Sequence, residues 1–305
     1  MLKTFRPAPP FRFLGIEDEF ADYVTAKAAL LPVPLERTTT YARGTRKGPC
    51  AIIEASRQVE TYDEELRRET YRDIGIHTLE EMETEEGPLE RVLADIHTGV
   101  AALFADGKLP VLLGGEHSLT PPAVSAAARR FSDLSVLQID AHADLRESYQ
   151  GNPNSHACAM RRVLEICPAV QVGIRSLSGE EAQELPRLKT RIYWAQDIVP
   201  HAAENWAARV AADLSEHVWL TIDVDGLDPS LMPATGTPEP GGLSWEQITS
   251  LVRAVARQRT IVGFDVVELL PTPGLHAADF LAAKLVYRIL GYIFCPPRAG
   301  ALGSR

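Results

Sequence analysis

The sequence predicts an α/β fold built on a mostly parallel β-sheet, and two patterns carry this prediction. Short apolar runs alternate with segments of helical periodicity along the chain, which is typical of βαβ units. The apolar runs lack an inward–outward alternation, as expected for parallel strands covered by helices on both faces. No repeat or linker divides the 305 residues, so we expect a single domain over residues 1–305.

The same patterns locate the main elements. A helix is predicted over 88–105, where apolar residues recur at helical spacing. A second helix covers 245–258 and begins with a capping box formed by Ser244 and Gln247. A third covers 277–292, and its core-facing residues are expected to be Phe280, Leu281, Leu285, Ile289 and Leu290. Strands are expected at 109–113, 134–139, 170–174, 218–222 and 261–266.

The composition argues against several classes of protein. The 41 acidic and 31 basic residues give a formal net charge of −10, whereas a nucleic-acid or anionic-membrane binder presents a basic face. No apolar run approaches the roughly 18 residues of a membrane helix. The N-terminal residues 1–13 lack the apolar core and cleavage site of a secretory signal. Four scattered cysteines without a C-x-x-C pair favour a reduced, cytoplasmic protein.

Three of the predicted strands end in polar residues of similar chemistry. They are followed by the motifs GGEHS, DAHAD and DVDGLDP. Side chains two apart on an extended strand share a face, so Asp140, His142 and Asp144 point the same way. The same holds for Asp223 and Asp225. Ligand sites in open α/β sheets lie beyond the carboxyl ends of the strands, which is where these groups fall.

A pair of divalent metal ions is the simplest explanation of this cluster. Crowded carboxylates cannot all stay ionised without a compensating cation. With His117, the cluster contains four carboxylates and two imidazoles, more ligands than one ion needs. Oxygen and nitrogen ligands without a thiolate favour an ion such as Mn²⁺ over a structural zinc. Taken alone, each motif has a plainer interpretation, because a D-x-D pair is commonly a strand end and a single histidine a loop residue.

The motifs GGEHS, DAHAD and TIDVDGLDPSLMPATGTPEPGG resemble the metal motifs of the ureohydrolase family of arginases and agmatinases. The resemblance extends from the loop GTRKGP at 44–49 to DVVELLP at 265–271. It implies a three-layer α/β/α domain and a hydrolase that acts on a linear guanidino group. It also implies a homo-oligomer, commonly a trimer or hexamer.

The resemblance further implies two Mn²⁺ ions per subunit. One ion would be held by His117, Asp140, Asp144 and Asp223. The other would be held by Asp140, His142, Asp223 and Asp225, with Asp140 and Asp223 bridging.

Catalytic and substrate-binding residues are likewise implied by the resemblance. Glu268 matches the residue that binds the guanidinium, and His156 matches the active-site histidine, acting as acid/base or proton shuttle. Asp144 would take a proton from the attacking water and deliver it to the departing amine. Asn154 and Thr237 complete the expected substrate-binding set. Without the other motifs, His156 and Glu268 would be interpreted as a loop histidine and a charge at a strand end.

The loop between Asp144 and His156 bears on the substrate. The stretch 140–162 is closer to agmatinases, whose substrate has no carboxylate, so we expect conversion of agmatine and water to putrescine and urea, a step of polyamine synthesis. Arg146 could instead bind a carboxylate and favour guanidinobutyrate or arginine. We expect that Arg146 instead forms a surface ion pair with Glu147 or another nearby acid.

Two alternatives from other classes stay open. A dimetal phosphoesterase would use similar carboxylates, although no basic motif that could grip phosphate is present. A non-catalytic metal-binding protein would hold the ions without turnover. Two departures from the family pattern also matter: Glu116 stands where many members have Asp, and Leu269 and Leu270 follow Glu268 where polar residues are common.

Overall fold

A computed structural model describes residues 11–200 and 205–295. Its main sheet has eight strands in the order β4-β1-β5-β10-β9-β6-β7-β8, and every neighbouring pair is parallel. These strands are β1 (Ala28–Val33), β4 (Ile76–Thr78), β5 (Leu109–Gly114), β6 (Leu134–Ile139), β7 (Ala169–Ile174), β8 (Thr190–Trp194), β9 (His217–Asp223) and β10 (Thr260–Val267). A separate antiparallel pair joins β2 (Tyr62–Asp63) to β3 (Arg68–Glu69).

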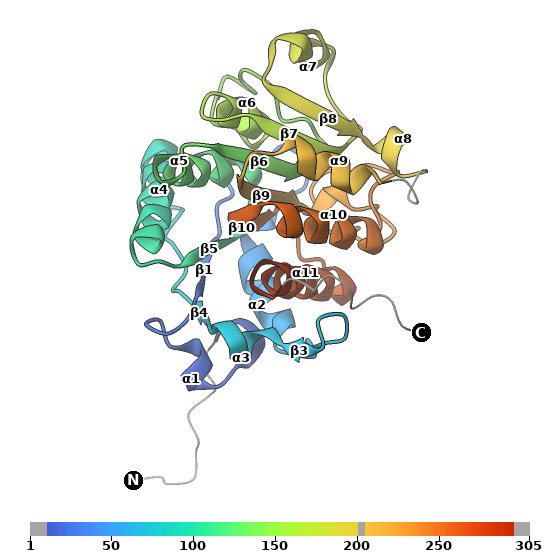
Figure 1. The fold of residues 1–305 in the computed structure, drawn as a ribbon. Coiled ribbons are helices and arrows are strands. Elements are labelled where there is room, and N and C mark those ends of the chain that lie inside the picture. Colours follow the sequence, from blue (N-terminus) through green and yellow to red (C-terminus); the bar gives the residue numbers. More distant parts are fainter. Residues whose placement is uncertain (1–10, 201–204, 296–305) are drawn as a thin grey trace.

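Helices cover both faces of the main sheet (Figure 1). One face packs against α4 (Leu89–Ala105), α5 (Thr120–Arg130) and α6 (Ala159–Leu164). The other packs against α2 (Gly48–Ser56), α9 (Trp206–Asp213), α10 (Trp245–Gln258) and α11 (His276–Phe294). The remaining helices are short: α1 (Asp18–Ala21), α3 (Thr70–Ile74), α7 (Gly179–Glu184) and α8 (Ala195–Ile198).

The two helical layers explain why the strand sequences are apolar throughout. In β6, Leu137 and Ile139 lie in the core shared with α10 and α11, whereas Val136 lies in the core shared with α4 and α5. All three side chains are fully buried, so both faces of the strand must be apolar. The three-layer α/β/α fold class predicted from the sequence is therefore confirmed.

The five predicted strands agree with the observed bounds to within one residue at each end. The helix 245–258 is also confirmed, together with its capping box, in which the Ser244 hydroxyl accepts from the Gln247 N–H over 3.2 Å. One prediction was wrong, because Phe280 of α11 is 41% exposed. His276, Ala277 and Phe280 lie on the exposed side of the start of α11, and the helix is mostly buried from Ala282 onward.

None of the described helices is long and apolar enough to cross a membrane. The expectation that residues 1–13 lack a secretory signal rests mostly on residues 1–10, which lie outside the described part of the chain. All four cysteines are free thiols, with Cys158 and Cys167 buried.

Candidate metal centre and active site

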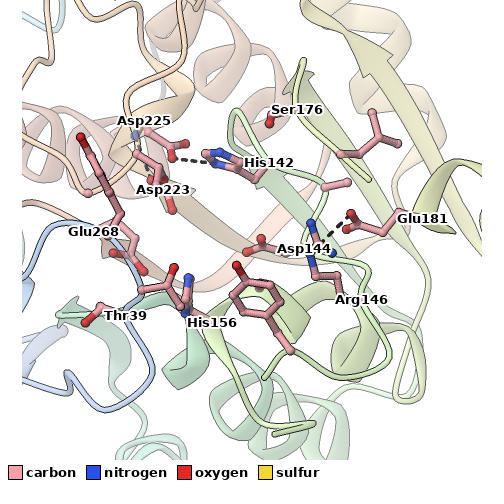
Figure 2. A pocket seen from close by; sticks show the side chains of 18 of the residues that line it. Thr39, His142, Asp144, Arg146, His156, Ser176, Glu181, Asp223, Asp225 and Glu268 are labelled. Carbon is pink, nitrogen blue, oxygen red and sulfur yellow. Dashed lines mark hydrogen bonds and ion pairs between the residues drawn. The ribbon is translucent and has the colours of Figure 1, made fainter. Parts of the chain in front are cut away.

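The sequence-predicted site residues gather at the carboxyl edge of four neighbouring strands. In the order β5, β10, β9 and β6, each of these central strands delivers one part of the site. Its members are His117 after β5, Glu268 after β10, Asp223 and Asp225 at the end of β9, and Asp140, His142 and Asp144 after β6. In Figure 2, the labelled side chains of His142, Asp144, Asp223, Asp225 and Glu268 from these loops lie around one pocket, together with His156 and Thr39.

One group of metal-ligand atoms forms around His117. The atoms offered by His117, Asp140 and Asp223 all lie within 4.8 Å of one another. His117 Nδ1 is 3.2 Å from Asp140 Oδ2 and 3.6 Å from Asp223 Oδ2. Asp144 Oδ2 is also 3.2 Å from this nitrogen. All four predicted ligands of the first ion are therefore brought together.

A second group forms around His142 and shares Asp140 with the first. Its members are Asp140, His142 and Asp225. His142 Nδ1 lies 2.9 Å from Asp225 Oδ2 and 3.7 Å from Asp140 Oδ1. Asp223, expected to bridge both ions, contributes a ligand atom to the first group, while its Oδ1 accepts the Asp225 N–H over 2.9 Å. One shared carboxylate thus joins two adjoining sets of oxygen and nitrogen ligands.

Local hydrogen bonds fix the shared carboxylate and its neighbours. Asp140 Oδ1 accepts the His142 N–H over 2.6 Å, and Oδ2 accepts from the Gln138 amide over 2.7 Å. Asp225 Oδ1 accepts the Ala141 N–H over 3.0 Å, which ties the β9 loop to the β6 loop. Gly226 permits this approach, because a Cβ there would lie only 2.8 Å from the backbone nitrogen of Asp140.

The buried carboxylates of the cluster repel one another and are stabilised by nearby positive charge. Burial and the Asp140 carboxylate raise the pKa of Asp225 to about 6. Burial and neighbouring carboxylates also raise the pKa of Asp223 and that of Asp144. Burial alone would lower the pKa of His142, but its contacts with Asp140 and Asp225 raise it to about 12. Divalent cations would balance these buried carboxylates.

The hydrogen bonds behind His117 support the same conclusion. Thr221 Oγ1 donates to Asp265 Oδ1 over 2.5 Å, so its oxygen accepts from His117 Nε2–H over 2.8 Å. Asp265 also accepts from the Trp219 indole N–H over 2.6 Å. This chain places the ring proton of a neutral His117 on Nε2, and the buried Nδ1 makes no hydrogen bond within the described part of the chain. A bare Nδ1 that faces carboxylates fits a metal ligand. Histidine ligands commonly donate the N–H of their other ring nitrogen to a neighbouring acceptor, as Nε2 of His117 does to Thr221.

Glu268 and Asp144 both have strained backbones. Their φ angles are 64° and 53°, in the left-handed region that non-glycine residues rarely adopt. Glu268 Oε1 accepts the His117 N–H over 2.8 Å, and burial together with the nearby Glu116 carboxylate raises the pKa of Glu268 well above its usual range. Strain of this kind persists where the surroundings hold it, typically at functional sites.

The substrate-binding candidates differ in their positions. Glu268, His156 and Thr237 line the pocket next to the metal-ligand groups, which encloses about 920 Å³ including its open mouth. Asn154 is not among the described residues that line this pocket, and its N–H instead donates to Asn152 Oδ1 over 2.9 Å within the loop.

Arg146 lines the same pocket but does not pair with Glu147. Its Nε lies 3.8 Å from Glu181 Oε2, and its guanidinium stacks over the Tyr149 ring at 4.9 Å. In Figure 2, Arg146 and Glu181 lie across the pocket from Glu268. Glu147 pairs with Arg161 and with Arg162 outside this pocket. The acid partner expected for Arg146 exists, and it is Glu181.

Several pocket residues had no signal in the sequence. They come from distant segments and are of ordinary types, so only the fold places them: Thr39, Thr40, Tyr41, Tyr149, Ser176 and Glu181. The chain behind His117 was missed for the same reason, although Thr221 and Asp265 are polar residues inside otherwise apolar strands, a pattern that could have revealed them.

Comparison with known proteins agrees with this geometry. The family model described as the Arginase family matches residues 26–291. The N(1)-aminopropylagmatine ureohydrolase of Synechocystis sp. is 38% identical over 290 residues, covering 93% of this chain and 94% of that protein. The agmatinase of Halalkalibacterium halodurans is 34% identical over 283 residues, covering 90% of this chain and 94% of that protein.

Solved structures show the same relationship. The agmatine ureohydrolase of Thermoplasma volcanium matches with a TM-score of 0.82 at 33% identity, covering 90% of this chain and 92% of that one. The family match and the relatives confirm the resemblance expected from the three motifs. The chain therefore belongs to the arginase family and is a hydrolase that acts on guanidino or amidino groups.

Proposed function

We propose that this protein is a binuclear manganese ureohydrolase that releases urea from a cationic guanidino amine. The observation that carries the proposal is the pair of ligand groups sharing Asp140, with the bare Nδ1 of His117 facing them. In this proposal His117, Asp140, Asp144 and Asp223 hold one ion, and Asp140, His142, Asp223 and Asp225 hold the other. When bound, the ions supply Lewis-acid charge that makes a water nucleophilic near neutral pH.

The protein's own groups would then bind the substrate and move protons. Glu268 pairs with the planar guanidinium, whose N–H groups can donate to both oxygens of a carboxylate. Asp144 removes a proton from the attacking water and delivers it to the departing amine nitrogen, while His156 exchanges protons with the same region. Cleavage of the C–N bond gives urea and the free amine. Thr237, at the pocket wall, is available for polar contacts with the substrate.

Agmatine is the first candidate substrate, with putrescine and urea as products. The charges around the pocket favour a substrate whose far end is cationic or neutral. Of the five carboxylates among the described lining residues, three belong to the proposed metal ligands and Glu268 is assigned to the guanidinium. The fifth, Glu181, lies against Arg146, the one arginine of this lining. A guanidino acid such as guanidinobutyrate or arginine would therefore bring its carboxylate to a pocket whose arginine already has an acidic partner. The curated relatives named agmatinase support the same choice.

The N(1)-aminopropyl derivative of agmatine is a second candidate. Three relatives at 38% identity are named N(1)-aminopropylagmatine ureohydrolases, whereas those named agmatinase are at 32–34%. The added aminopropyl arm carries a further amine, for which Glu181 on the far side of the pocket is a possible acidic partner. The pocket is open to solvent, so a longer amine can extend through its mouth.

A substrate panel tests the proposal. The Mn²⁺-loaded protein is incubated with agmatine, N(1)-aminopropylagmatine, arginine, guanidinobutyrate and a generic phosphate ester. Urea from one or both of the first two supports the proposal, and the larger kcat/KM identifies the substrate. Urea only from a guanidino acid would contradict the choice of substrate. Phosphate release would favour a phosphoesterase, and no product from any compound would favour a non-catalytic metal-binding protein.

We also infer a cytoplasmic homo-oligomer, a trimer or hexamer. The four free cysteines support a reducing compartment, and family resemblance supports the assembly. Light scattering coupled to gel filtration tests the oligomeric state, and a monomeric mass at micromolar concentration would contradict it.

A further inference from the structure

Glu116, the residue that departs from the usual Asp before His117, is fully buried and accepts four hydrogen bonds. Its Oε2 accepts the backbone N–H groups of Arg37 and Thr38 over 2.7 and 2.6 Å. Its Oε1 accepts from the hydroxyls of Thr38 and Ser118 over 2.8 and 2.6 Å. The Glu116 carboxylate therefore clamps the segment that follows β1 against the loop that follows β5.

The clamped Thr38 hydroxyl lies against His156. A threonine hydroxyl has one hydrogen and two lone pairs. The hydrogen is donated to Glu116, and one lone pair accepts the backbone N–H of His156 over 2.9 Å. His156 Nδ1 lies 3.2 Å from the same oxygen. The Thr38 oxygen has only a lone pair left for its contact with Nδ1. Nδ1 must therefore carry a hydrogen and donate it to this oxygen.

The surroundings of the ring agree with this assignment. Ser155 Oγ lies 3.3 Å from Nδ1 and can either accept from it or donate to it, so the ring proton is fixed by Thr38 rather than by Ser155. A bare Nδ1 would instead oppose its lone pair to that of the Thr38 oxygen. His156 Nε2 makes no hydrogen bond to residues 11–200 or 205–295, and the ring lines the substrate pocket.

We propose that Glu116 and Thr38 are positioning residues that fix the tautomer of His156, holding a proton on Nδ1 and leaving Nε2 to exchange protons with the pocket. In the neutral ring Nε2 then presents a lone pair. It can take one proton from the reaction and return it to the departing amine, while the proton on Nδ1 stays in place. The kinetic consequence rests on the proposed ureohydrolase function, whereas the tautomer does not.

The tautomer can be measured directly by two-bond ¹H–¹⁵N NMR of protein labelled with [¹⁵N]histidine. The sample is loaded with Zn²⁺, a diamagnetic ion, and held above the pH range where a solvated histidine titrates. The His156 signals are identified by their loss in His156→Asn. We expect the Nδ1–H tautomer in the wild type and in the matched variants Thr38→Ser and Ser155→Ala. An Nε2–H tautomer in the wild type would overturn the proposal.

Two further variants test the direction of the hydrogen bonds. Thr38→Val removes the hydroxyl, and we expect the Nε2–H tautomer to appear. Glu116→Gln keeps the shape of the side chain. Its amide oxygen must accept the backbone N–H groups of Arg37 and Thr38, so its NH₂ group faces the Thr38 hydroxyl. The Thr38 hydroxyl then accepts from the amide and donates to Nδ1, so we expect the Nε2–H tautomer to dominate. An unchanged Nδ1–H tautomer in both variants would overturn the proposal.

Urea release separates this proposal from the proposed function. We expect Thr38→Val to lower kcat by about tenfold, the size of one lost hydrogen bond, with KM close to wild type and activity retained in Thr38→Ser. The metal content of each variant is measured alongside. If the wild type releases no urea from any guanidino compound, the proposed function fails while the NMR result still decides the tautomer. A kcat for Thr38→Val equal to wild type, despite urea release, would contradict a role for the tautomer in turnover.

Discussion

The backbone N–H of His117 donates to the carboxylate of Glu268 over 2.8 Å, although the two residues are 151 positions apart in the chain. They follow the neighbouring parallel strands β5 and β10. A residue expected to hold metal and the residue expected to bind guanidinium are thus joined by one hydrogen bond. The positive φ of Glu268 keeps its carboxylate in this position.

Replacing Glu268 with Gln should weaken substrate binding and turnover while leaving the metal centre intact. Charged hydrogen bonds contribute about 1.5–3 kcal/mol, so kcat/KM for the guanidino substrate should fall by about 10- to 100-fold. Burial raises the pKa of Glu268, so a neutral amide is tolerated there. Steady-state urea assays and metal analysis test this. Glu147→Gln, outside this pocket, serves as the control, and equal kcat/KM for both variants would remove Glu268 from the guanidinium site.

Asp144→Asn tests the proposed proton carrier. Asn adopts left-handed φ angles readily, so the backbone at φ 53° should be kept. Its amide oxygen can still approach a metal ion, but the group no longer accepts and returns a proton. We expect urea release to fall by about 10²- to 10⁴-fold, the usual contribution of general acid–base catalysis. Asp133→Asn at the surface is the control. Turnover near wild type in Asp144→Asn would show that another group carries the proton.

Asp265→Asn should weaken metal binding without touching a metal ligand. To satisfy the Trp219 N–H, the Asn oxygen must face the indole, and its NH₂ must face Thr221. The Thr221 hydroxyl would then donate to His117 Nε2 and move the ring proton to Nδ1. Loss of such a supporting partner typically lowers metal affinity by about 10- to 100-fold.

Isothermal titration with Mn²⁺ measures this effect on Asp265→Asn. Asp213→Asn, which disturbs an exposed contact with Arg191, provides the comparison. An affinity of Asp265→Asn equal to that of wild type would mean that the chain behind His117 does not set its tautomer.

Asp228 gives the loop that carries Thr237 a stability that depends on pH. Its carboxylate accepts four hydrogen bonds, from the N–H and hydroxyl of Ser230 and from the N–H groups of Gly241 and Gly242. These lower the pKa of Asp228 to about 2 from its usual 3.8. A lowered pKa stabilises the folded state above the usual pKa, and this contribution is lost as the pH falls through the folded value.

Asp228→Asn should therefore melt below wild type at neutral pH, because an amide cannot accept at both positions. The gap in Tm should narrow between about pH 4 and pH 2, where the wild-type carboxylate becomes protonated. Thermal melts of both proteins across this range test the prediction. A gap that stays constant or widens on acidification would contradict the assigned pKa shift.

The central strands could be predicted from the sequence because they are apolar on both faces and end in polar motifs. The outer strands gave weaker signals. β4 has only three residues, and β8 is partly exposed along its length. β1 contains Pro32, which removes a backbone donor from a strand that lies between two others. These strands are specified by their neighbours in the sheet rather than by their own pattern.

The clustering of the proposed metal ligands could also be predicted, because they occur in compact motifs at strand ends. The residues that orient them could not. Thr38 reaches His156 across 118 positions, and Asp265 reaches Thr221 across 44. A single hydroxyl or carboxylate in a strand or loop has many possible partners, and only the parallel order β1-β5-β10-β9-β6 brings these together. The partner of Arg146 was likewise set by tertiary contact with Glu181 rather than by the adjacent Glu147.

The most direct measurement is anomalous diffraction at the manganese edge from crystals grown with Mn²⁺. The account predicts two anomalous peaks in each subunit. One should lie between His117 Nδ1 and the Asp140 and Asp223 carboxylates, and the other between His142 Nδ1 and the Asp140 and Asp225 carboxylates. The contradicting result would be an anomalous map with neither peak at saturating Mn²⁺, and electron density that shows these side chains turned away from one another. The binuclear centre, on which the proposed chemistry depends, would then be wrong.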